Sequence, residues 1–488
     1  MSLCCSSARR SAEPQAASHW DASPLPVAII GGGPVGLAAA THLLERGIEP
    51  IVLEAGPSVG TSTRAWGHVR MFSPWRYNTD KACRALLERH GWTAPDPEAF
   101  PTGHELAGRY LEPLASVPEL APRVRLGTRV TAVARAGLGK VRTAGREAAP
   151  FDIRFEDAEG REGRLLARAV LDASGTWGNP NPAGASGLPA PGEREAADRI
   201  RHGMPDVLGA DRGRYAGRRV MVLGSGDSAL GVLIDLARLA DQTPGTAIIW
   251  AARNRDLTRA FGGGAADQLP ERGALGMRVR ALVERGVLDV VKPFAVDGFG
   301  RAASGRLLVT GLDGTGARAI EVDEMVVATG LRPDLGLLRE VRLDLDPALD
   351  CPRALAPLID PNVHSCGTVR PHGAAELEQP DPGLFIVGMK SYGRAPTFLL
   401  ATGYEQVRSI AAFLAGDLEA ARRVELDLPQ TGVCSANRVS PETADAEASC
   451  RTPETPQGAC CPPKPELVEE APCYGSACRE IVQAEAAE

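Results

Sequence analysis

The first part of the chain alternates apolar runs with a glycine-rich turn and a helical segment. An apolar run over residues 27–30 is followed by Gly31, Gly33 and Gly36, and then by an Ala- and Leu-rich stretch with helical spacing. A second apolar run ends at Glu54. This order predicts a strand, a helix and a second strand, which together form the βαβ unit that binds dinucleotides.

The turn of this unit carries the expected nucleotide contacts. Its glycines allow a tight turn and let backbone amides approach a pyrophosphate at the helix N-terminus. Glu54 lies eighteen residues after Gly36, where a carboxylate can accept hydrogen bonds from ribose hydroxyls. We expect the neighbouring residues Pro34 and Ala55 to contact the same nucleotide. The alternative is a plain strand–helix turn without a ligand.

A second unit of the same kind begins near residue 219. The apolar run 220–223 leads into a turn that has glycine, glycine and alanine at the three equivalent positions, and a helical segment follows. The residues expected to contact a nucleotide there are Gly224, Gly226, Asp227, Ser228 and Ala229. Two such sites in one chain imply two redox nucleotides, as in a flavoprotein that is reduced by a nicotinamide.

The end of the next strand bears on which nicotinamide is used. The stretch 247–251 has no acid at its end and is followed by Arg253 and Arg255. An arginine at this position suits the 2′-phosphate of NADPH, whereas an acid suits the ribose of NADH. We therefore expect NADPH, with Arg253 on its phosphate. The alternative is that both arginines are ordinary surface charges.

An apolar strand that runs into Ser-Gly or Thr-Gly occurs once in each half, at residues 173–175 and 328–330. Each copy follows a β-meander, so the chain contains a weak internal repeat, and we expect Gly175 and Gly330 to contact the nucleotides. The first meander is expected to contain strands at 124–135, 151–156 and 165–171. The predicted fold class is α/β with two Rossmann-like domains, the second inserted in the first.

The domain boundaries follow from this repeat and from composition. We expect a disordered N-terminus over 1–24, a first nucleotide-binding domain in two parts over 25–215 and 336–428, a second nucleotide-binding domain over 216–335, and a disordered Cys-, Pro- and Glu-rich tail over 429–488. The tail has too little apolar content to form a core.

Composition places the chain among soluble globular proteins, with 44% apolar and 24% charged residues in a total of 488. No apolar run is long enough for a membrane span, and residues 1–24 lack the apolar core of a secretory signal. Most of the net charge of −7 lies after Pro429, where there are ten acidic and four basic side chains. The rest of the chain is therefore nearly neutral. We therefore expect a cytoplasmic protein that binds neither nucleic acid nor membrane.

The motifs resemble those of the class B flavin-dependent monooxygenase superfamily, close to the flavin-containing monooxygenases. More narrowly, they are similar to the flavoprotein monooxygenases of bacterial arsenic-resistance operons. The resemblance covers about residues 25–430 and rests on both glycine-rich turns and on the stretches Phe100–Leu111, Asp172–Pro180, Ala328–Asp334 and Val387–Val407. It implies FAD at the first turn, NADPH at the second, and transfer of an oxygen atom from a flavin hydroperoxide to a soft nucleophile.

The sequence departs from related families at three points. The FxGxxxH signature of sulfur- and nitrogen-oxygenating relatives is only echoed, with His202 either as its histidine or as a linker residue. The Gly-Asp pair that grips the flavin ribityl chain in disulfide reductases is Gly388-Met389 here. No CxxxxC pair follows Glu54, which excludes flavin-to-disulfide transfer by the usual route.

Aromatic and basic residues gather in the segment 65–80, where the resemblance places the flavin-facing wall. We expect Arg70 or Arg76 to hold an electron-rich flavin or an oxidised product, and Asn78 to hydrogen-bond the flavin edge. Lys390 follows the third FAD strand and is expected to line the same cavity. The alternatives are a core aromatic patch for the first segment and a solvated loop for the second.

Six of the eleven cysteines lie after Pro429. The adjacent pair Cys460-Cys461, together with Cys473 and Cys478, is a candidate site for a thiophilic ion, with As(III) as the first candidate. The alternative is a low-complexity tail in which the cysteines are incidental.

Three functions remain open on the sequence alone. The leading hypothesis is an NADPH- and FAD-dependent monooxygenase that uses O2 to oxygenate a small sulfur, nitrogen or arsenic compound in a water-poor cavity. The second is an NADPH-dependent flavin reductase that passes electrons through the tail cysteines to thiols or a metalloid. The third is a flavin-bearing protein that delivers a metalloid. The sequence names no substrate, and a homodimer stays open.

Overall fold

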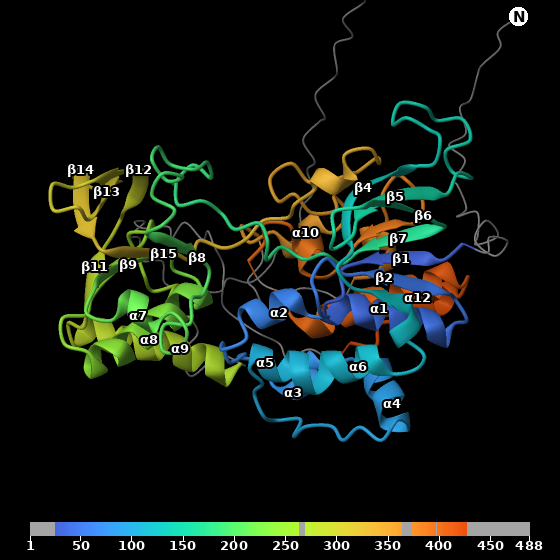
Figure 1. Cartoon of the computed structure of the whole chain (residues 1–488), viewed down its shortest axis with the longest axis horizontal. Coiled ribbons are helices and arrows are strands. Elements are labelled where there is room, and N and C mark those ends of the chain that lie inside the picture. The colour runs from blue at the N-terminus through green and yellow to red at the C-terminus, as the bar shows by residue number, and fades with distance from the viewer. Residues whose placement is uncertain (1–24, 263–268, 364–371, 397, 427–488) are drawn as a thin grey trace, which may run out of the picture. The chain divides into compact units, whose positions relative to one another are not determined.

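Two five-stranded parallel sheets organise residues 25–262, 269–363, 372–396 and 398–426, which the computed structural model describes (Figure 1). The first sheet has the order β16-β7-β1-β2-β3, with the strands Leu384–Ile386, Ala169–Asp172, Val27–Ile30, Pro50–Leu53 and Val124–Arg125. The second has the order β11-β10-β9-β15-β8, with the strands Leu288–Val291, Ala247–Ala251, Arg219–Leu223, Glu324–Val327 and Ile200–His202. The predicted α/β class with Rossmann-like parallel sheets is confirmed.

The central strands are continuous apolar runs because they are covered on both faces. All four residues of β1 are buried, and so are all four of β7 and β15. Strand β1 pairs in parallel with β2 and β7, so that Val27 lies opposite both Pro50 and Ala169. Parallel sheets of this kind need helices or further strands on each face.

An antiparallel three-stranded meander accompanies each parallel sheet. The first contains β4 (Arg129–Arg135), β5 (Phe151–Glu156) and β6 (Glu162–Ala167), and the second contains β12 (Ala295–Arg301), β13 (Leu307–Asp313) and β14 (Gly316–Val322). The prediction of a single strand over 124–135 is wrong. The strand is interrupted at Gly127, where φ is 59°, and β3 belongs to the parallel sheet. The strand expected over 165–171 is likewise divided between β6 and β7, which belong to different sheets.

Helices cover the sheet faces opposite the meanders (Figure 1). Helices α1 (Pro34–Glu45) and α12 (Leu400–Leu414) pack on each other beneath the first sheet, and α8 (Asp227–Gln242) and α9 (Pro270–Glu284) do so beneath the second. The remaining helical segments are short: α2 (Thr61–Ala65), α3 (Trp75–Asn78), α4 (Lys81–Arg89), α5 (Gly103–Leu106), the π-helix η1 (Ala107–Leu111), α6 (Glu112–Ser116), η2 (Ala121–Arg123), α7 (Arg212–Tyr215), η4 (Gly336–Leu338), α10 (Ala356–Ile359), α11 (Ala374–Leu377), η5 (Gly388–Tyr392) and α13 (Leu418–Arg422).

Two chain segments connect the sheets, and they are bonded to each other. The chain leaves the first sheet after β7 and returns to it at β16. On the way, Pro180 and Leu331 form an isolated antiparallel bridge. Beside it, the Asn179 side-chain amide donates to the carbonyl oxygen of Pro333 (3.2 Å), and that of Asn181 donates to the carbonyl oxygen of Thr329 (3.1 Å). The connections therefore form one paired unit.

A charged pair is buried in the core beside α1. His42 Nε2 lies 3.1 Å from Asp80 Oδ2, and the other carboxylate oxygen accepts from the backbone N–H of Cys83, which caps α4. Burial opposes protonation of His42, but Asp80 and Glu45 outweigh it and raise the pKa of His42 to about 9. The reciprocal interaction with His42 lowers the pKa of Asp80 despite its burial. The pair ties α1 to α4.

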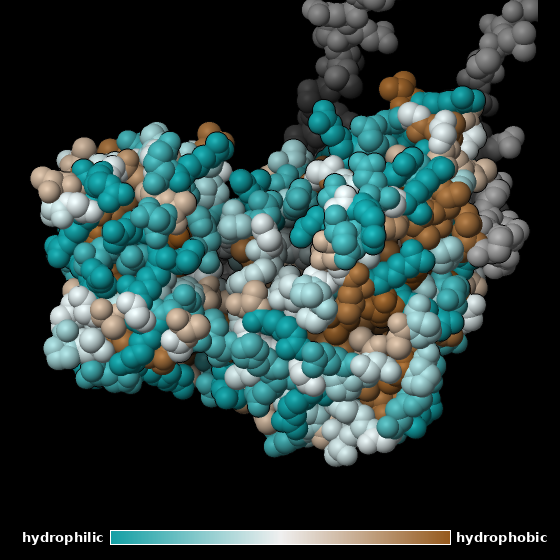
Figure 2. All heavy atoms as spheres, viewed as in Figure 1, coloured by the Kyte–Doolittle hydropathy of each residue, from teal (hydrophilic) through white to brown (hydrophobic). Residues whose placement is uncertain are grey.

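The visible surface is largely hydrophilic, with apolar residues gathered over α1 and the strands beside it (Figure 2). Among the described residues, no helix combines the length and the apolar character that crossing a membrane requires.

Candidate functional site

The first glycine-rich turn is shaped by two close backbone approaches and one open position. A Cβ on Gly31 would lie 2.7 Å from the carbonyl oxygen of Ala173, and one on Gly36 would lie 2.0 Å from that of Gly31. A Cβ on Gly33, in contrast, would meet nothing within 4 Å. The first and third glycines are therefore required for packing, and the second leaves the space that a pyrophosphate needs.

The helix behind this turn begins without a side-chain cap. Gly33 is the N-cap of α1, Pro34 is its first residue, and no side chain accepts from the first-turn amides. Glu54 lies beside the turn, where its two oxygens accept from the backbone N–H groups of Gly32 (2.7 Å) and Gly56 (2.8 Å). Each oxygen keeps a further lone pair for a ribose hydroxyl. The geometry therefore fits a dinucleotide, with Ala55 directly after the carboxylate.

The second turn repeats the geometry of the first. Gly224 has a φ of 133°, and a Cβ on it would lie 2.2 Å from the carbonyl oxygen of Ala328. Gly226 is the uncapped N-cap of α8 and faces open space. Ala229 takes the third position, and Trp250 Nε1 donates to the carbonyl oxygen of Gly224 (2.8 Å). This turn also fits a pyrophosphate.

Arg253 lies just beyond β10 and is exposed. Its guanidinium donates to the carbonyl oxygen of Ala185 at 3.2 Å. Arg255 lies beside the turn at Gly314, where a Cβ would be 3.0 Å from its guanidinium. A bond to one backbone carbonyl leaves most donors of Arg253 free for a phosphate.

A cleft of about 620 Å³ extends from the start of α1 to α8 and α9. Asp227 and Ser228 of the second turn line it, as does Pro34 of the first. Its apolar lining residues are Trp66, Val69, Met71, Phe72, Leu106, Met204, Val232, Ile234, Leu275, Phe398, Leu399 and Leu400. The cleft thus adjoins both turns and offers a largely apolar wall.

Charged residues of the cleft lie mainly on α8 and α9. Asp235 Oδ1 pairs with Arg238 at 3.2 Å, and Arg278 lies 3.6 Å from Glu271. Burial raises the pKa of Asp235, although the charges of Arg238 and His68 oppose the shift. A carboxylate in this state gains from any additional cationic or hydrogen-bonding partner.

Of the four catalytic candidates, Arg70 alone lines the cleft. Its guanidinium donates to the carbonyl oxygen of Phe100. Arg76 instead forms an ion pair with Glu98 and lies over the ring of Tyr77, 4.8 Å from its centroid. Arg76 therefore holds a surface loop in this structure.

Asn78 is fully buried, and its amide is occupied within its own loop. Its nitrogen donates to the carbonyl oxygens of Ser73 (2.6 Å) and Pro74 (3.0 Å), and its oxygen accepts from the Ser73 hydroxyl. Lys390 is also buried, with Nζ 2.6 Å from Asp172 Oδ2. Neither residue lines this cleft, and each has a close internal partner.

A polar network that the sequence analysis missed holds the start of η5. The Gly388 N–H donates to Gln406 Oε1 (2.7 Å), which fixes the amide of Gln406 with its nitrogen toward Ser391 Oγ (2.9 Å) and His372 Nε2 (2.8 Å). Gly388 itself has a φ of 67°. The available signal was a glutamine in a helix that is largely apolar at its ends.

Gly175 and Gly330 end equivalent turns after β7 and β15. Both have positive φ, at 69° and 92°. A Cβ on Gly175 would meet nothing within 4 Å, whereas one on Gly330 would lie 3.4 Å from the Asn181 side chain. The turn after β7 thus leaves open space beside Gly175, as the glycine-rich turn does beside Gly33.

The proposed metal ligands Cys460, Cys461, Cys473 and Cys478 lie outside the described residues. Within the described ranges, no group of three His, Cys, Asp or Glu side chains is arranged to hold a metal ion. Cys83 and Cys351 are free and buried. His202 is the last residue of β8, and its Nε2 lies 3.4 Å from Glu193 Oε1, an ion-pair distance.

Residues 26–111 match the family described as FAD dependent oxidoreductase. A monooxygenase, cfoE, of Aspergillus candidus is 29% identical over 239 residues, which is 47% of this chain and 36% of the relative. Indole-3-pyruvate monooxygenase YUCCA1 of Oryza sativa subsp. japonica is 30% identical over 43% of this chain and 44% of its own length. A ferredoxin–NADP reductase of Gluconobacter oxydans is 29% identical over 49% and 63%. The matches span less than two thirds of these relatives.

Solved structures share the fold over most of the chain. The bacillithiol disulfide reductase of Bacillus cereus superposes with a TM-score of 0.58 at 20% identity, over 82% of this chain and 99% of that one. The cadaverine monooxygenase DfoA of Erwinia amylovora, bound to FAD, gives a TM-score of 0.55 at 15% identity, over 85% and 100%. The chain is therefore similar in its first segment to FAD dependent oxidoreductases and shares the fold of the solved structures named above, and both of its glycine turns fit a dinucleotide.

Proposed function

We propose that this protein is an NADPH- and FAD-dependent monooxygenase that transfers one oxygen atom of O2 to a small soft nucleophile, a sulfur, nitrogen or arsenic compound. The observation that carries the proposal is the cleft that adjoins both glycine turns, because hydride transfer requires the two cofactors to meet. Similarity to monooxygenases over nearly half of the chain supports the same reaction class.

The proposed roles of the first turn follow from its geometry. Gly33 gives the pyrophosphate of FAD access to the uncapped end of α1, and Glu54 accepts from the ribose hydroxyls. Bound FAD supplies the acceptor for hydride and the activation of O2. In the second turn, Gly226 gives NADPH the same access to α8, and Arg253 pairs with its 2′-phosphate.

The protein's own contribution is to orient the reactants and to exclude water. The apolar side chains of the cleft disfavour solvent where the oxygen atom is transferred. Arg70, at the margin of this wall, is the candidate that pairs with an anionic flavin or an oxidised product. Asn78 and Lys390 act on the segments that surround the cofactor, because their partners are internal. Arg76 holds a surface loop through its ion pair with Glu98.

An NADPH-dependent flavin reductase is the second candidate, and the similarity to a ferredoxin–NADP reductase favours it. In this version, the tail cysteines carry electrons from the flavin to thiols or a metalloid. The two free cysteines of the described body are buried, so they are poor relays.

The test is a stopped-flow experiment in two stages. NADPH is first added without oxygen, and it should bleach the yellow flavin. O2 is then added with a thioether, an amine or a trivalent arsenical. One oxygenated product per NADPH supports the monooxygenase, and H2O2 with no oxygenated product in every case contradicts it. Turnover that needs no O2 and disappears when the tail cysteines are replaced by serine identifies the reductase instead.

The proposal includes a role in arsenic resistance, with an arsenic compound as one of the proposed substrates. The tail cysteines Cys460, Cys461, Cys473 and Cys478 are proposed to bind As(III), because thiolates select soft ions. A cytoplasmic location is proposed with it, and so is an insertion of the NADPH domain, which includes β8 and therefore begins before the expected residue 216.

A further inference from the structure

A closed ring of charged and polar bonds lies where β7 ends. Lys390 Nζ contacts Asp172 Oδ2 at 2.6 Å, and both side chains are 0% exposed. The same ammonium donates to Ser174 Oγ (2.9 Å), and this hydroxyl donates to Asp172 Oδ1 (2.6 Å). The backbone N–H of Ser174 also donates to Asp172 Oδ1 at 3.1 Å. Three side chains thus join the turn after β7 to η5, from positions more than 200 residues apart.

Both segments joined by this ring touch the first glycine turn. On one side, the carbonyl oxygen of Ala173 is the atom that a Cβ on Gly31 would strike at 2.7 Å. On the other side, a Cβ on Gly388 would lie 3.3 Å from the side chain of Val35, in the first turn of α1. A movement of either segment therefore changes the space beside the pyrophosphate position.

The ring also fixes an open backbone position. Gly175 follows Ser174 directly, has a φ of 69°, and would carry a Cβ in open space. The carboxyl edge of a parallel sheet is where nucleotides bind. A fixed, unobstructed backbone at this edge is what a bound dinucleotide requires.

Stability alone is a weak reason for burying these charges. Desolvation of a buried ion pair usually offsets its attraction, and apolar replacements of both partners are often neutral. Removing one partner is different, because it leaves a buried charge without a counterion.

We propose that Asp172, Ser174 and Lys390 form a positioning site for FAD. They hold the 173–175 turn and η5 at a fixed separation, so that both walls of the cofactor site keep their shape. Lys390 directly follows Met389, which stands at the position of the aspartate in the Gly-Asp pair of disulfide reductases. The inference rests on the proposed binding of FAD at the first turn. Because its side chain is fully buried, Lys390 acts through the backbone segments that it joins.

The experiment compares Lys390→Met with the double variant Asp172→Asn/Lys390→Met. FAD affinity is measured from the flavin fluorescence released on dilution of the holoenzyme, and stability from thermal unfolding at saturating FAD. The absorption spectrum of the bound flavin is recorded for each protein. None of these readouts depends on turnover.

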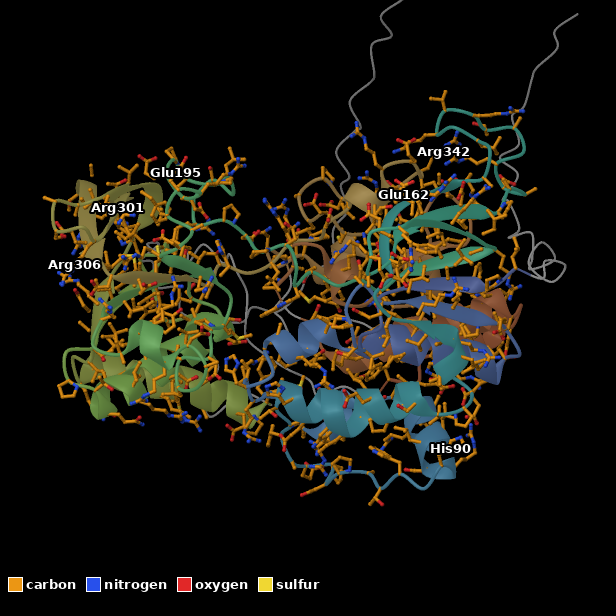
Figure 3. All side chains as sticks on the ribbon, viewed as in Figure 1. His90, Glu162, Glu195, Arg301, Arg306 and Arg342 are labelled. Atoms are coloured by element: carbon orange, nitrogen blue, oxygen red, sulfur yellow. The ribbon has the colours of Figure 1, made fainter. Side chains whose placement is uncertain are left out.

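A buried ion pair at the other end of β16 provides the matched control. Asp381 precedes this strand and accepts from Arg146 through both oxygens, at 2.6 and 2.7 Å. The adjacent Arg342 donates its backbone N–H to Asp381, and its side chain bonds the 140–143 loop, which Figure 3 shows on the meander side of the sheet. Arg146→Met and Arg146→Met/Asp381→Asn likewise remove a buried cation and then neutralise its carboxylate, here at the amino edge, where Arg135 Nε also lies 3.7 Å from Asp381.

The expected result separates positioning from stability. Lys390→Met should lower the unfolding temperature and weaken FAD binding by about tenfold, as loss of a charge-assisted hydrogen bond implies. The double variant should recover most of the unfolding temperature but keep the weakened binding and an altered flavin spectrum, because methionine cannot bond Ser174. The control variants should lower stability with unchanged FAD affinity.

Recovery of both properties in the double variant would show a purely structural pair and overturn the inference. So would unchanged FAD affinity and an unchanged spectrum in both Lys390 variants. If Lys390→Met does not fold, the double variant alone decides, because it carries no orphaned charge. A wild-type protein that binds no FAD would instead contradict the proposed function.

Discussion

A Cβ atom on Gly224 would lie 2.2 Å from the carbonyl oxygen of Ala328. The same relationship, at 2.7 Å, holds between Gly31 and the carbonyl oxygen of Ala173. In both halves, the residue that follows the neighbouring strand, β7 or β15, therefore packs its carbonyl oxygen against the first glycine of the turn. The internal repeat seen in the sequence thus has a counterpart in atomic contacts, and it makes the two nucleotide sites separately testable.

Gly224→Ala should abolish detectable NADPH binding and leave FAD content unchanged. The added methyl group would collide with a backbone oxygen, and the φ of 133° is strained for any L side chain. Flavin absorbance and isothermal titration with NADPH measure the two properties. Gly213→Ala, in α7 with nothing within 4 Å of its added Cβ, is the control and should bind both nucleotides normally. Normal NADPH binding by Gly224→Ala would remove the second turn from the proposed site.

Arg253→Glu should weaken NADPH binding by about tenfold or more and change NADH binding little. One charge-assisted bond to a phosphate is worth roughly 1.5–3 kcal/mol, and the substituted carboxylate adds repulsion. Steady-state KM values for both nucleotides provide the measurement. Arg301→Glu makes the same charge change at a site on β12 and should alter neither value (Figure 3). An equal loss with NADPH and NADH would mean that Arg253 is structural.

Stability should fall as the pH rises through the neutral range, because His42 binds its proton more tightly when folded. Its pKa of about 9 exceeds the ordinary value of 6.5, so the contribution is complete below about pH 6.5 and lost as the pH passes 9. The shift corresponds to a contribution on the order of 3 kcal/mol. Urea denaturation of wild type and His42→Gln between pH 6 and pH 9.5 measures it.

In this experiment, the difference in unfolding free energy between wild type and His42→Gln should shrink with rising pH. His90→Gln is the control, since His90 pairs with Glu119 at 2.8 Å on the exposed end of α4 (Figure 3). An exposed pair contributes little, so its effect should be small at every pH. A pH-independent difference for His42 would show that folding does not shift its pKa, and a difference that grows with pH would show that the ring is neutral in the folded protein.

Cys83 and Cys351 should resist alkylation in the folded protein. Burial raises the pKa of Cys83 well above the ordinary range and that of Cys351 to about 12, and the thiolate is the reactive form. Iodoacetamide labelling at pH 8, followed by peptide mass mapping, should modify both residues only after denaturation. Rapid native labelling of either one would contradict the described packing.

Truncation after Leu428 should leave flavin content and melting temperature unchanged and abolish tight As(III) binding. The reason is that the proposed thiolate ligands all follow this residue, whereas Cys83 and Cys351 are buried. Equilibrium dialysis of both forms with As(III) checks it. Equal binding by the truncated protein would assign the ion to the body.

Local pattern was sufficient for the parts of the fold that are fixed by neighbouring residues. The strand–turn–helix order around Gly31 and Gly224 was readable because strand, turn and helix follow each other directly. Strands β12 and β14 have no clear sequence pattern, since glycines and charged residues such as Gly298 and Arg318 hide their alternation, and they are stabilised by pairing with β13.

The side chains of the site were less predictable because their partners are distant in sequence. Lys390 looked like a cavity residue, yet Asp172, 218 positions earlier, draws it into the interior. Asn78 looked available because the turn at Ser73 that uses its amide has no sequence signature. Charge and residue type indicate chemistry, but burial is decided by tertiary neighbours.

The bridge between Pro180 and Leu331 has a consequence for how such a chain can be altered. The two segments that connect the sheets are already neighbours at these two residues. All five strands of the second sheet lie between these two residues in the sequence, so we expect that a tight turn can replace this stretch without moving either cut end. Truncation from the C-terminus has no such freedom once it reaches Ile386, because it then removes β16, the edge strand of the first sheet.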